Sequence, residues 1–297
     1  MGRLTSTLLA GSASGVAALA YAAGYERQAY VLRRVEIPCL PAGSAPLRVL
    51  HISDVHLTPG QTRKQSWVRR LADVEPDLVI NTGDNLAHMQ SVPVVMRAYG
   101  DLLDLPGVFV LGSNDYFAPV LKNPARYLLP RRTIRATGAR LPWRDLRDAF
   151  CARGWLDLDN RLEALTINGL RLSFAGVDDP HLRYDDLAAV DGPADSSADL
   201  TIGVAHAPYL RVLNQFNAAG YTLILTGHTH GGQLRVPGVG ALVTNCDLDR
   251  KRARGLHQHQ VGGRPPSWLH ISAGLGTSPY APVRFCCRPE ATLLTLR

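Results

Sequence analysis

LRVLHISDVH, residues 47–56, joins an apolar run to two potential metal ligands. Its first six residues, 47–52, are rich in Leu, Val and Ile and follow a Pro-containing linker, residues 38–46. A short apolar run bounded by turn residues predicts a buried strand. Asp54 and His56 come directly after that strand, and ligands in α/β proteins bind outside the carboxyl ends of strands. The stretch therefore predicts an α/β fold with a functional site at its strand ends.

The rest of the chain continues this alternation. Apolar residues at helical spacing alternate with short apolar runs as far as residue 111, which predicts a β-α-β-α-β unit. Asn168-Gly169 separates two apolar runs and indicates a β-hairpin. In chain order we expect strands at 47–52, 78–80, 108–111, 162–167, 170–174, 201–205 and 222–226, helices at 67–74, 92–105 and 209–218, and C-terminal antiparallel strands at 268–273 and 283–296. We expect an N-terminal segment and linker, 1–46, and one domain, 47–297, with an Arg- and Pro-rich insertion or cap at 116–160.

Five of the expected strand ends carry side chains with nitrogen or oxygen ligands. They are Asp54 and His56 in SDVH, Asp84 in TGDN, Asn114 and Asp115 in GSND, His206 in VAHAP, and His228 and His230 in TGHTHGG. Imidazoles mixed with carboxylates, without thiolate, favour Mn, Fe or Zn over Mg or Ca. A central carboxylate can bridge two ions, which share a hydroxide available at neutral pH and clamp a phosphate. The sequence therefore predicts a phosphoesterase that uses two divalent metal ions.

The other histidines belong to no such group of motifs, and we expect structural or solvent-exposed positions for them. They are His51, His88, His181, His257, His259 and His270. A metallo-β-lactamase-type hydrolase needs the pattern H-x-H-x-D-H, but His228-Thr229-His230 is followed by Gly-Gly-Gln. That class is excluded.

The order SDVH, GD, GSND, AH and GHTHGGQ resembles the calcineurin-like metallophosphoesterase family, whose pattern runs D-x-H, G-D, G-N-H-[DE], H and G-H-x-H. The resemblance covers roughly residues 47–297. GHTHGGQLRVPGVGAL and GLGTSPYAPVRFCCRPE are similar to a bacterial branch of membrane-associated phosphodiesterases. The resemblance implies a four-layer αββα sandwich with mixed sheets. It also implies one metal on Asp54, His56, Asp84 and His230, and a second on Asp84, the Asn of the third motif, His206 and His228.

The third motif departs from the family pattern. Where the family has G-N-H-D, this chain has Gly112-Ser113-Asn114-Asp115. Either Ser113 replaces the metal-binding Asn and Asn114 replaces the catalytic His, or Asn114 binds the metal and no residue fills the His position. An amide cannot transfer a proton at neutral pH, so general-acid assistance is lost in both cases. We favour Asn114 as the ligand, because its amide oxygen binds metals better than the hydroxyl of Ser113.

The net charge of the chain indicates which partners it attracts. The formal charge of +7 and the pI near 9.4 favour anionic partners. The basic residues are scattered and the densest run, 251–254, is typical of a solvated loop, so nucleic acid is not an expected partner. The five cysteines match no zinc module, and we expect thiols in a reducing compartment. The oligomeric state stays open.

The N-terminus carries a long uncharged stretch. The 22 residues between Arg3 and Glu26 suffice for a helix that crosses a bilayer. We favour an uncleaved anchor, with a cleaved signal or a helix packed on the protein as alternatives. More basic residues follow the stretch than precede it, which places the domain on the cytoplasmic side of a membrane.

These observations lead to one expected function with two alternatives. We expect a metal-dependent phosphoesterase that hydrolyses a phosphodiester or pyrophosphate, which could be lipid-linked. The first alternative is a phosphomonoesterase or nucleotidase. The second is a phosphate-binding module of low turnover, because the usual catalytic His is missing.

Overall fold

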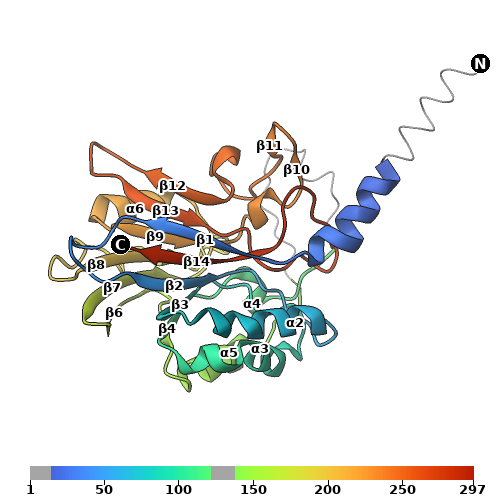
Figure 1. The fold of residues 1–297 in the computed structure, drawn as a ribbon, viewed down its shortest axis with the longest axis horizontal. Coiled ribbons are helices and arrows are strands. Elements are labelled where there is room, and N and C mark those ends of the chain that lie inside the picture. The colour runs from blue at the N-terminus through green and yellow to red at the C-terminus, as the bar shows by residue number, and fades with distance from the viewer. Residues whose placement is uncertain (1–14, 122–137) are drawn as a thin grey trace, which may run out of the picture.

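The computed structural model describes residues 15–121 and 138–297. Two six-stranded sheets pack face to face, with helices on both outer faces (Figure 1). This arrangement confirms the predicted αββα sandwich with mixed sheets. A two-stranded ribbon and several short helices connect these layers.

The first sheet has, in spatial order, β1 (Val31–Ile37), β14 (Glu290–Leu296), β2 (Leu47–Ile52), β3 (Leu78–Asn81), β4 (Gly107–Phe109) and β5 (Leu156–Asp157). The second has β12 (Gly255–His259), β13 (Ser267–Ile271), β9 (Leu223–Thr226), β8 (Leu200–Ala205), β7 (Leu170–Val177) and β6 (Arg161–Ile167). The ribbon pairs β10 (Arg235–Val236) with β11 (Gly240–Ala241).

The helices are α2 (Thr62–Arg69), α3 (Ser91–Tyr99), α4 (Ser113–Tyr116), α5 (Trp143–Cys151) and α6 (Leu210–Ala219). Short helical turns are η1 (Tyr21–Tyr25), η2 (Glu26–Gln28), η3 (Arg70–Val74), η4 (Gly100–Asp104), η6 (His230–Gly232) and η7 (Arg250–Arg252). Each predicted helix is present. The hairpin at Asn168-Gly169 is present as well, and both residues adopt the positive φ that its turn requires.

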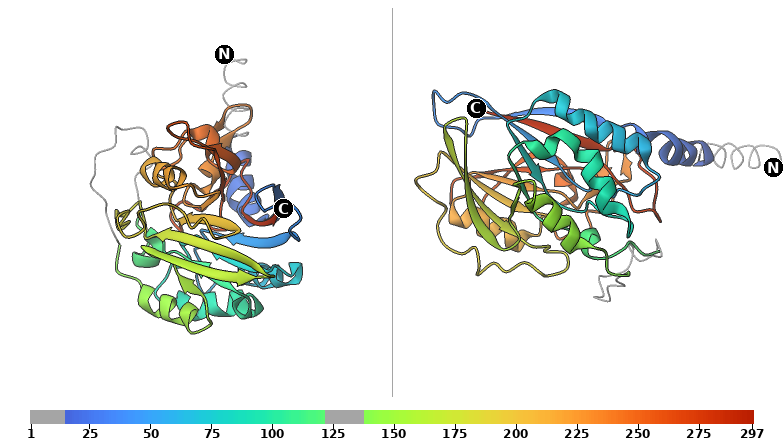
Figure 2. Two further views of the ribbon diagram at one scale, coloured as in Figure 1. Left: turned by 90° about the vertical axis from the view of Figure 1, so that its left-hand side faces the viewer. Right: turned by 90° about the horizontal axis from the view of Figure 1, so that it is seen from below.

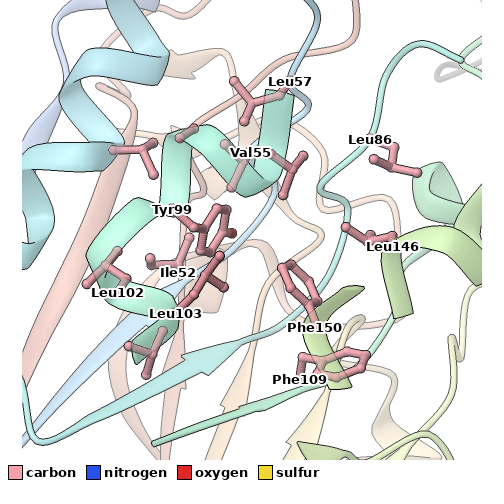
Figure 3. Packing of buried hydrophobic residues seen from close by; sticks show 14 of the residues in the cluster. Ile52, Val55, Leu57, Leu86, Tyr99, Leu102, Leu103, Phe109, Leu146 and Phe150 are labelled. Atoms are coloured by element: carbon pink, nitrogen blue, oxygen red, sulfur yellow. The ribbon is translucent and has the colours of Figure 1, made fainter. Parts of the chain in front are cut away.

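Three apolar layers hold the sandwich together. Aromatic residues fill the space between the first sheet and α2, α3 and α5, where the Phe150 ring lies 5.2 Å from Phe109 and 5.7 Å from Tyr99 (Figure 3). The layer between the two sheets is almost entirely aliphatic, and includes Leu47, Val49 and Ile202. A third layer packs α6 on the second sheet. Buried apolar area of this kind is the main stabilising term of a globular fold.

Strand direction positions the functional site. β2, β3 and β4 are parallel neighbours, so their carboxyl ends meet at one edge of the first sheet. β7, β8, β9 and β13 are parallel neighbours in the second sheet. Loops from both sheets therefore converge at one end of the sandwich.

Two segments that the sequence placed outside the main domain or in an insertion belong to the sandwich. β1 lies before the predicted domain start at residue 47, yet it pairs in parallel with β14 along its whole length. Its sequence, VLRRVEI, places polar residues in the centre because it is an edge strand, half exposed, and carries no continuous apolar run. Within the predicted insertion 116–160, α5 packs on the first sheet and β5 extends that sheet. Residues 122–137 of that insertion lie outside the part of the chain described.

The two C-terminal strands do not pair with each other. β13 lies in the second sheet, antiparallel to β12 and parallel to β9. β14 lies in the first sheet, antiparallel to β2 and parallel to β1. The expectation of antiparallel strands is therefore right for one neighbour of each strand. The chain crosses from one sheet to the other between residues 271 and 290.

The N-terminal stretch begins the described chain as a helix. Residues 15–20 are helical and continue into η1 at one end of the sandwich (Figure 2). Across residues 15–121 and 138–297, no helix has both the length and the apolar character needed to cross a membrane. Residues 1–14 of the expected anchor lie outside the described chain. All five cysteines are free thiols, as expected.

Candidate metal centre

The structure brings four of the expected ligands together in one buried group. Asp54 and His56 follow β2, Asp84 follows β3, and His230 follows β9. One ligand atom from each lies within 4.8 Å of the others. His56 Nε2 is 3.4 Å from Asp84 Oδ2, and His230 Nε2 is 3.6 Å from Asp54 Oδ1. We call these four residues the first ligand group.

Unpartnered polar atoms show that the first ligand group suits a cation. Within the described chain, Asp54 Oδ1 and both ring nitrogens of His56 are buried without a hydrogen-bond partner. A buried polar atom left unpaired costs about 1–3 kcal/mol. The lone pairs of Asp54 Oδ1 and His230 Nε2 instead face a common space. A divalent cation in that space would satisfy them together.

A second group of acceptors meets on the other side of Asp84. His206 Nε2 lies 3.5 Å from Asp84 Oδ1 and 3.3 Å from His228 Nδ1. The other ring nitrogen of His206 donates to the Thr82 carbonyl over 2.7 Å, which leaves Nε2 of the neutral ring as an acceptor. Three acceptor atoms therefore converge. Asp84 touches both groups, with Oδ2 on the first and Oδ1 on the second.

Backbone carbonyls orient the imidazoles of the TGHTHGG motif. His230 Nδ1 donates to the Gly276 carbonyl over 3.2 Å, and His228 Nε2 lies 3.4 Å from the Asn245 carbonyl. Histidines that bind metals usually donate their second ring nitrogen to a carbonyl or carboxylate, which fixes the tautomer and the ring orientation. His206, His228 and His230 all show this arrangement.

The backbone is strained at most of the proposed ligands. Residues other than Gly rarely adopt positive φ, and such strain persists where the surrounding structure enforces it at functional sites. Five ligand positions have φ between 45° and 67°: Asp54, His56, Asp84, His228 and His230. Strand ends on two sheets thus impose a costly conformation that turns these side chains toward one point.

Two glycines allow the loops to approach each other. A Cβ on Gly112 would lie 2.4 Å from Asp84 Oδ1 and 2.7 Å from the His206 ring. A Cβ on Gly227 would lie 2.6 Å from Asp54 Oδ2. Any side chain at either position would displace a ligand, which explains the glycines of GSND and TGHTHGG.

The electrostatics of the centre favour added positive charge. Burial lowers the pKa of His228 and His230 well below the usual range, so both rings are neutral. Burial alone would raise the pKa of Asp84, but His206 and His56 beside it hold the pKa well below its usual range. Burial lowers the pKa of His206, but Asp84 and Asp54 outweigh it and raise the pKa well above 6.5. A proton on His206 can thus take the place of a cation.

The third motif places Asn114, rather than Ser113, against the Asp84 carboxylate. Asn114 donates from its backbone to Asp84 Oδ1 over 2.7 Å and from its side-chain amide to Asp84 Oδ2 over 2.8 Å. Asp115 is fully buried and accepts from the backbone of Asp84, Asn85 and Gly112. Asp115 therefore fixes the loop that carries Asp84 and is not itself a ligand.

Sequence analysis missed two residues beside the centre. His181, which we expected to be structural or exposed, has its ring 4.5 Å from that of His228. Asp179 is fully buried and accepts from the His181 backbone over 2.8 Å; burial raises its pKa to about 7. Both lie in a long loop after β7, where residues 177–199 have no regular periodicity. The sequence DDPH at 178–181 carries ligand-type side chains and could have been noted as a strand-end motif.

Fold and site together define a class: an αββα sandwich with an Asp/His cluster in the loops that follow its strands, the architecture of metallophosphoesterases. The family of calcineurin-like phosphoesterases matches residues 47–232, more than half of this chain. The chain therefore belongs to the calcineurin-like phosphoesterase family, and its fold is that of a phosphoester hydrolase. Members of this family typically bind divalent metals, and the first ligand group is a candidate site for one.

Several curated proteins are similar to this chain. A bovine transmembrane protein with a metallophosphoesterase domain is 28% identical over 89% of this chain and 56% of its own length. An uncharacterized metallophosphoesterase of Aquifex aeolicus is 27% identical over 89% of both chains. Phosphodiesterase YaeI of Escherichia coli is 41% identical over 26% of this chain and 25% of its own. The chain thus spans about half the length of the bovine relative.

Proposed function

We propose that this protein is a dinuclear metal-dependent phosphoesterase that hydrolyses a phosphodiester or a pyrophosphate. The observation that carries the proposal is the position of Asp84, whose two carboxylate oxygens face two separate sets of imidazoles. One carboxylate placed in this way can serve two ions. The first ion would be held by Asp54, His56, Asp84 and His230, and the second by Asp84, Asn114, His206 and His228.

The chain's own groups hold and orient the reactants. When bound, two divalent ions such as Mn, Fe or Zn supply Lewis acidity and lower the pKa of a water to near 7. The buried carboxylates Asp54 and Asp84 balance the charge of the ions, and the neutral imidazoles complete the coordination. Carbonyl groups behind His206 and His230 keep each ring fixed, so little reorganisation accompanies the reaction.

Asn114 limits which leaving groups the enzyme can expel. Its amide can orient a phosphate oxygen or bind a metal, but it cannot give a proton to a leaving group. Loss of a general acid costs about 10²–10⁴ in rate. A phosphodiester or pyrophosphate with a good leaving group therefore suits the site better than a simple alkyl ester.

The names of two relatives bear on where this protein acts. One is named a phosphodiesterase and another a transmembrane protein. In this chain the N-terminal helical residues Val16, Leu19 and Tyr25 are each more than 60% exposed. We propose membrane association through this segment, with the domain on the cytoplasmic side and a lipid-linked ester as one substrate. Full-length protein that stays in the aqueous phase on detergent partitioning would contradict the association.

The activity is tested with purified, metal-stripped protein. We expect added Mn²⁺ to restore hydrolysis of bis(p-nitrophenyl) phosphate, followed as release of p-nitrophenolate. Comparison with p-nitrophenyl phosphate decides between a diesterase and the alternative of a phosphomonoesterase or nucleotidase. If metal and phosphate bind but neither ester is cleaved, the protein is a phosphate-binding module of low turnover and the proposed function is wrong.

A further inference from the structure

An aromatic pocket is lined in part by α4, the turn that carries Asn114, and takes no part in the mechanism described so far. It has a volume of about 160 Å³. We call this cavity the aromatic pocket. Its lining residues are Tyr116, Phe117, Arg140, Trp143 and Tyr184. An apolar cavity of about 150 Å³ accommodates one benzene molecule. The aromatic pocket is thus large enough for a single planar ring.

The aromatic pocket is built from one tilted and one edge-to-face pair of rings. The Tyr116 ring lies 5.0 Å from the Trp143 ring and 5.2 Å from the Tyr184 ring, the latter at 84°. Rings in these orientations attract one another and present both faces and edges to a guest. Tyr116 is almost fully buried, whereas the Tyr184 side chain is 42% exposed and open to solvent. The wall formed by Tyr184 can therefore receive a ring from outside.

Two short segments join the aromatic pocket to the metal centre. Tyr116 belongs to the same turn, α4, as Asn114, whose amide contacts Asp84. The Tyr116 hydroxyl donates to Asp178 over 2.8 Å. Asp178 and Tyr184 in turn flank the loop that carries His181 against the ring of His228. The segments that bound the metal centre on this side also form the walls of the pocket.

Arginine side chains line the aromatic pocket or stack on its Trp143, whereas the Asp178 carboxylate lies against Tyr116. The Arg144 guanidinium stacks 4.5 Å from the Trp143 ring centre, and that of Arg147 lies 5.5 Å away. Arg140 lines the pocket and is exposed. Cationic side chains beside stacked rings attract an anionic ester whose organic group is flat. A flexible aliphatic group would gain nothing from the ring orientations.

We propose that the aromatic pocket binds a planar aromatic ring carried by the phosphate ester, either an aryl group or a nucleobase. The inference rests on the proposed function, because the metal centre would hold the phosphate while the pocket holds the ring. The inference restricts the class of substrates from all phosphodiesters and pyrophosphates to those that carry a planar ring near the phosphorus. Tyr184 is the residue that determines this specificity.

The test measures equilibrium binding of phosphonates, which are not hydrolysed, to Mn²⁺-loaded protein by calorimetry. The ligands are methylphosphonate, cyclohexylphosphonate, phenylphosphonate and the 5′-phosphonate of thymidine. We expect phenylphosphonate to bind roughly 5- to 150-fold more tightly than methylphosphonate, the range that one aromatic stack contributes. Cyclohexylphosphonate has an apolar ring of similar size that is not planar. Its affinity should be well below that of phenylphosphonate if the pocket selects planar rings. Tighter binding of the thymidine ligand than of phenylphosphonate identifies a nucleobase, and the reverse identifies an aryl group.

Variants of Tyr184 make the test specific. Tyr184→Ala should bring the phenyl-to-methyl affinity ratio close to one while leaving methylphosphonate binding unchanged. Tyr184→Phe keeps the ring and should keep the ratio. Tyr25→Ala removes another exposed ring, from the N-terminal helical segment, and serves as the control. Equal binding of phenyl- and methylphosphonate, or an unchanged ratio in Tyr184→Ala, overturns the inference. Failure to hydrolyse bis(p-nitrophenyl) phosphate would instead refute the proposed function and leave these ratios measurable.

Discussion

The two sheets contribute different chemistry to the metal centre. Loops after the first sheet supply both carboxylates, Asp54 and Asp84, whereas the loops after β8 and β9 of the second sheet supply imidazoles. The carboxylates bring the negative charge that retains divalent ions. The imidazoles are held by carbonyls, and those of His228 and His230 are neutral, so they set where each ion sits. Loss of Asp84, which faces both ligand groups, should therefore affect both ions, and loss of an imidazole from the second sheet's loops should alter one ion at a time.

Asp84→Ala should have the largest effect. Because Asp84 faces both ligand groups, we expect this variant to lose dinuclear metal binding and hydrolysis of bis(p-nitrophenyl) phosphate. His228→Ala and His230→Ala should each remove mainly one ion. Elemental analysis of the purified variants measures the metal content. Two ions per chain in Asp84→Ala would contradict the role of Asp84 as a ligand shared by both ions.

Asn114 comes next, because it adds an amide where the family pattern has a proton donor. If the amide binds a metal, Asn114→Ala should lose one ion, and Asn114→His should lower activity on all esters alike. If the amide lies in the position of the catalytic His, Asn114→His should accelerate alkyl esters by up to about 10²–10⁴ and leave activated aryl esters nearly unchanged. The dependence of kcat on leaving-group pKa, measured together with metal content, separates these outcomes. We expect the first, because the amide oxygen of Asn114 is a better metal ligand than the Ser113 hydroxyl and Asn114 lies against Asp84.

His181 tests how far the second sheet's imidazoles depend on their neighbours. His181→Phe keeps a ring against His228 but removes the ring nitrogens. Residues that support a metal ligand typically change metal affinity or activity by about 10–100-fold, and we expect a loss of this size for one ion only. His257→Phe on β12 is the control. Metal titrations that give the same two affinities in His181→Phe and in the unaltered protein would assign His181 a packing role.

The smallest effect on the centre should come from a buried histidine pair between the sheets. His51 on β2 and His270 on β13 share a hydrogen bond of 2.9 Å. Burial lowers the pKa of His270 to about 4 and that of His51 well below the usual range, so both are neutral in the folded state. The unfolded chain takes up these protons below a pKa of about 6.5. The pair's contribution to stability is therefore complete above pH 6.5 and lost as the pH falls toward 4.

Urea denaturation at several pH values measures this contribution. His270 alone accounts for about 3 kcal/mol of lost stability over that pH window. The double variant His51→Gln/His270→Gln should flatten the dependence of the free energy of unfolding on pH between 6.5 and 4. Its metal content at pH 7 should stay unchanged, because neither residue belongs to a ligand group. An equally steep pH dependence in the double variant would mean that other buried groups dominate.

The sequence predicted most of the fold because strands and helices here follow the apolar periodicity of a two-sided sandwich. Leu47–Ile52 is buried at every position except Arg48 and was predicted, whereas the half-exposed edge strand Val31–Ile37 has arginines at its centre and was not. The ligand residues were predictable because each lies within a few residues of the end of a buried strand. His181 was not singled out, although it also lies four residues after a buried strand, because its loop lacks periodicity and its partner His228 is remote in sequence. Contacts of that kind depend on how the two sheets pack.

The location of bound ions tests the central claim most directly. Crystals of the protein loaded with Mn²⁺ and phosphate would reveal each ion by anomalous scattering. We predict two peaks about 3.5–4 Å apart, with Asp84 between them and phosphate on both. One ion should contact Asp54, His56 and His230, and the other should contact His206 and His228. A single peak, or two peaks that Asp84 does not join, would contradict a dinuclear phosphoesterase.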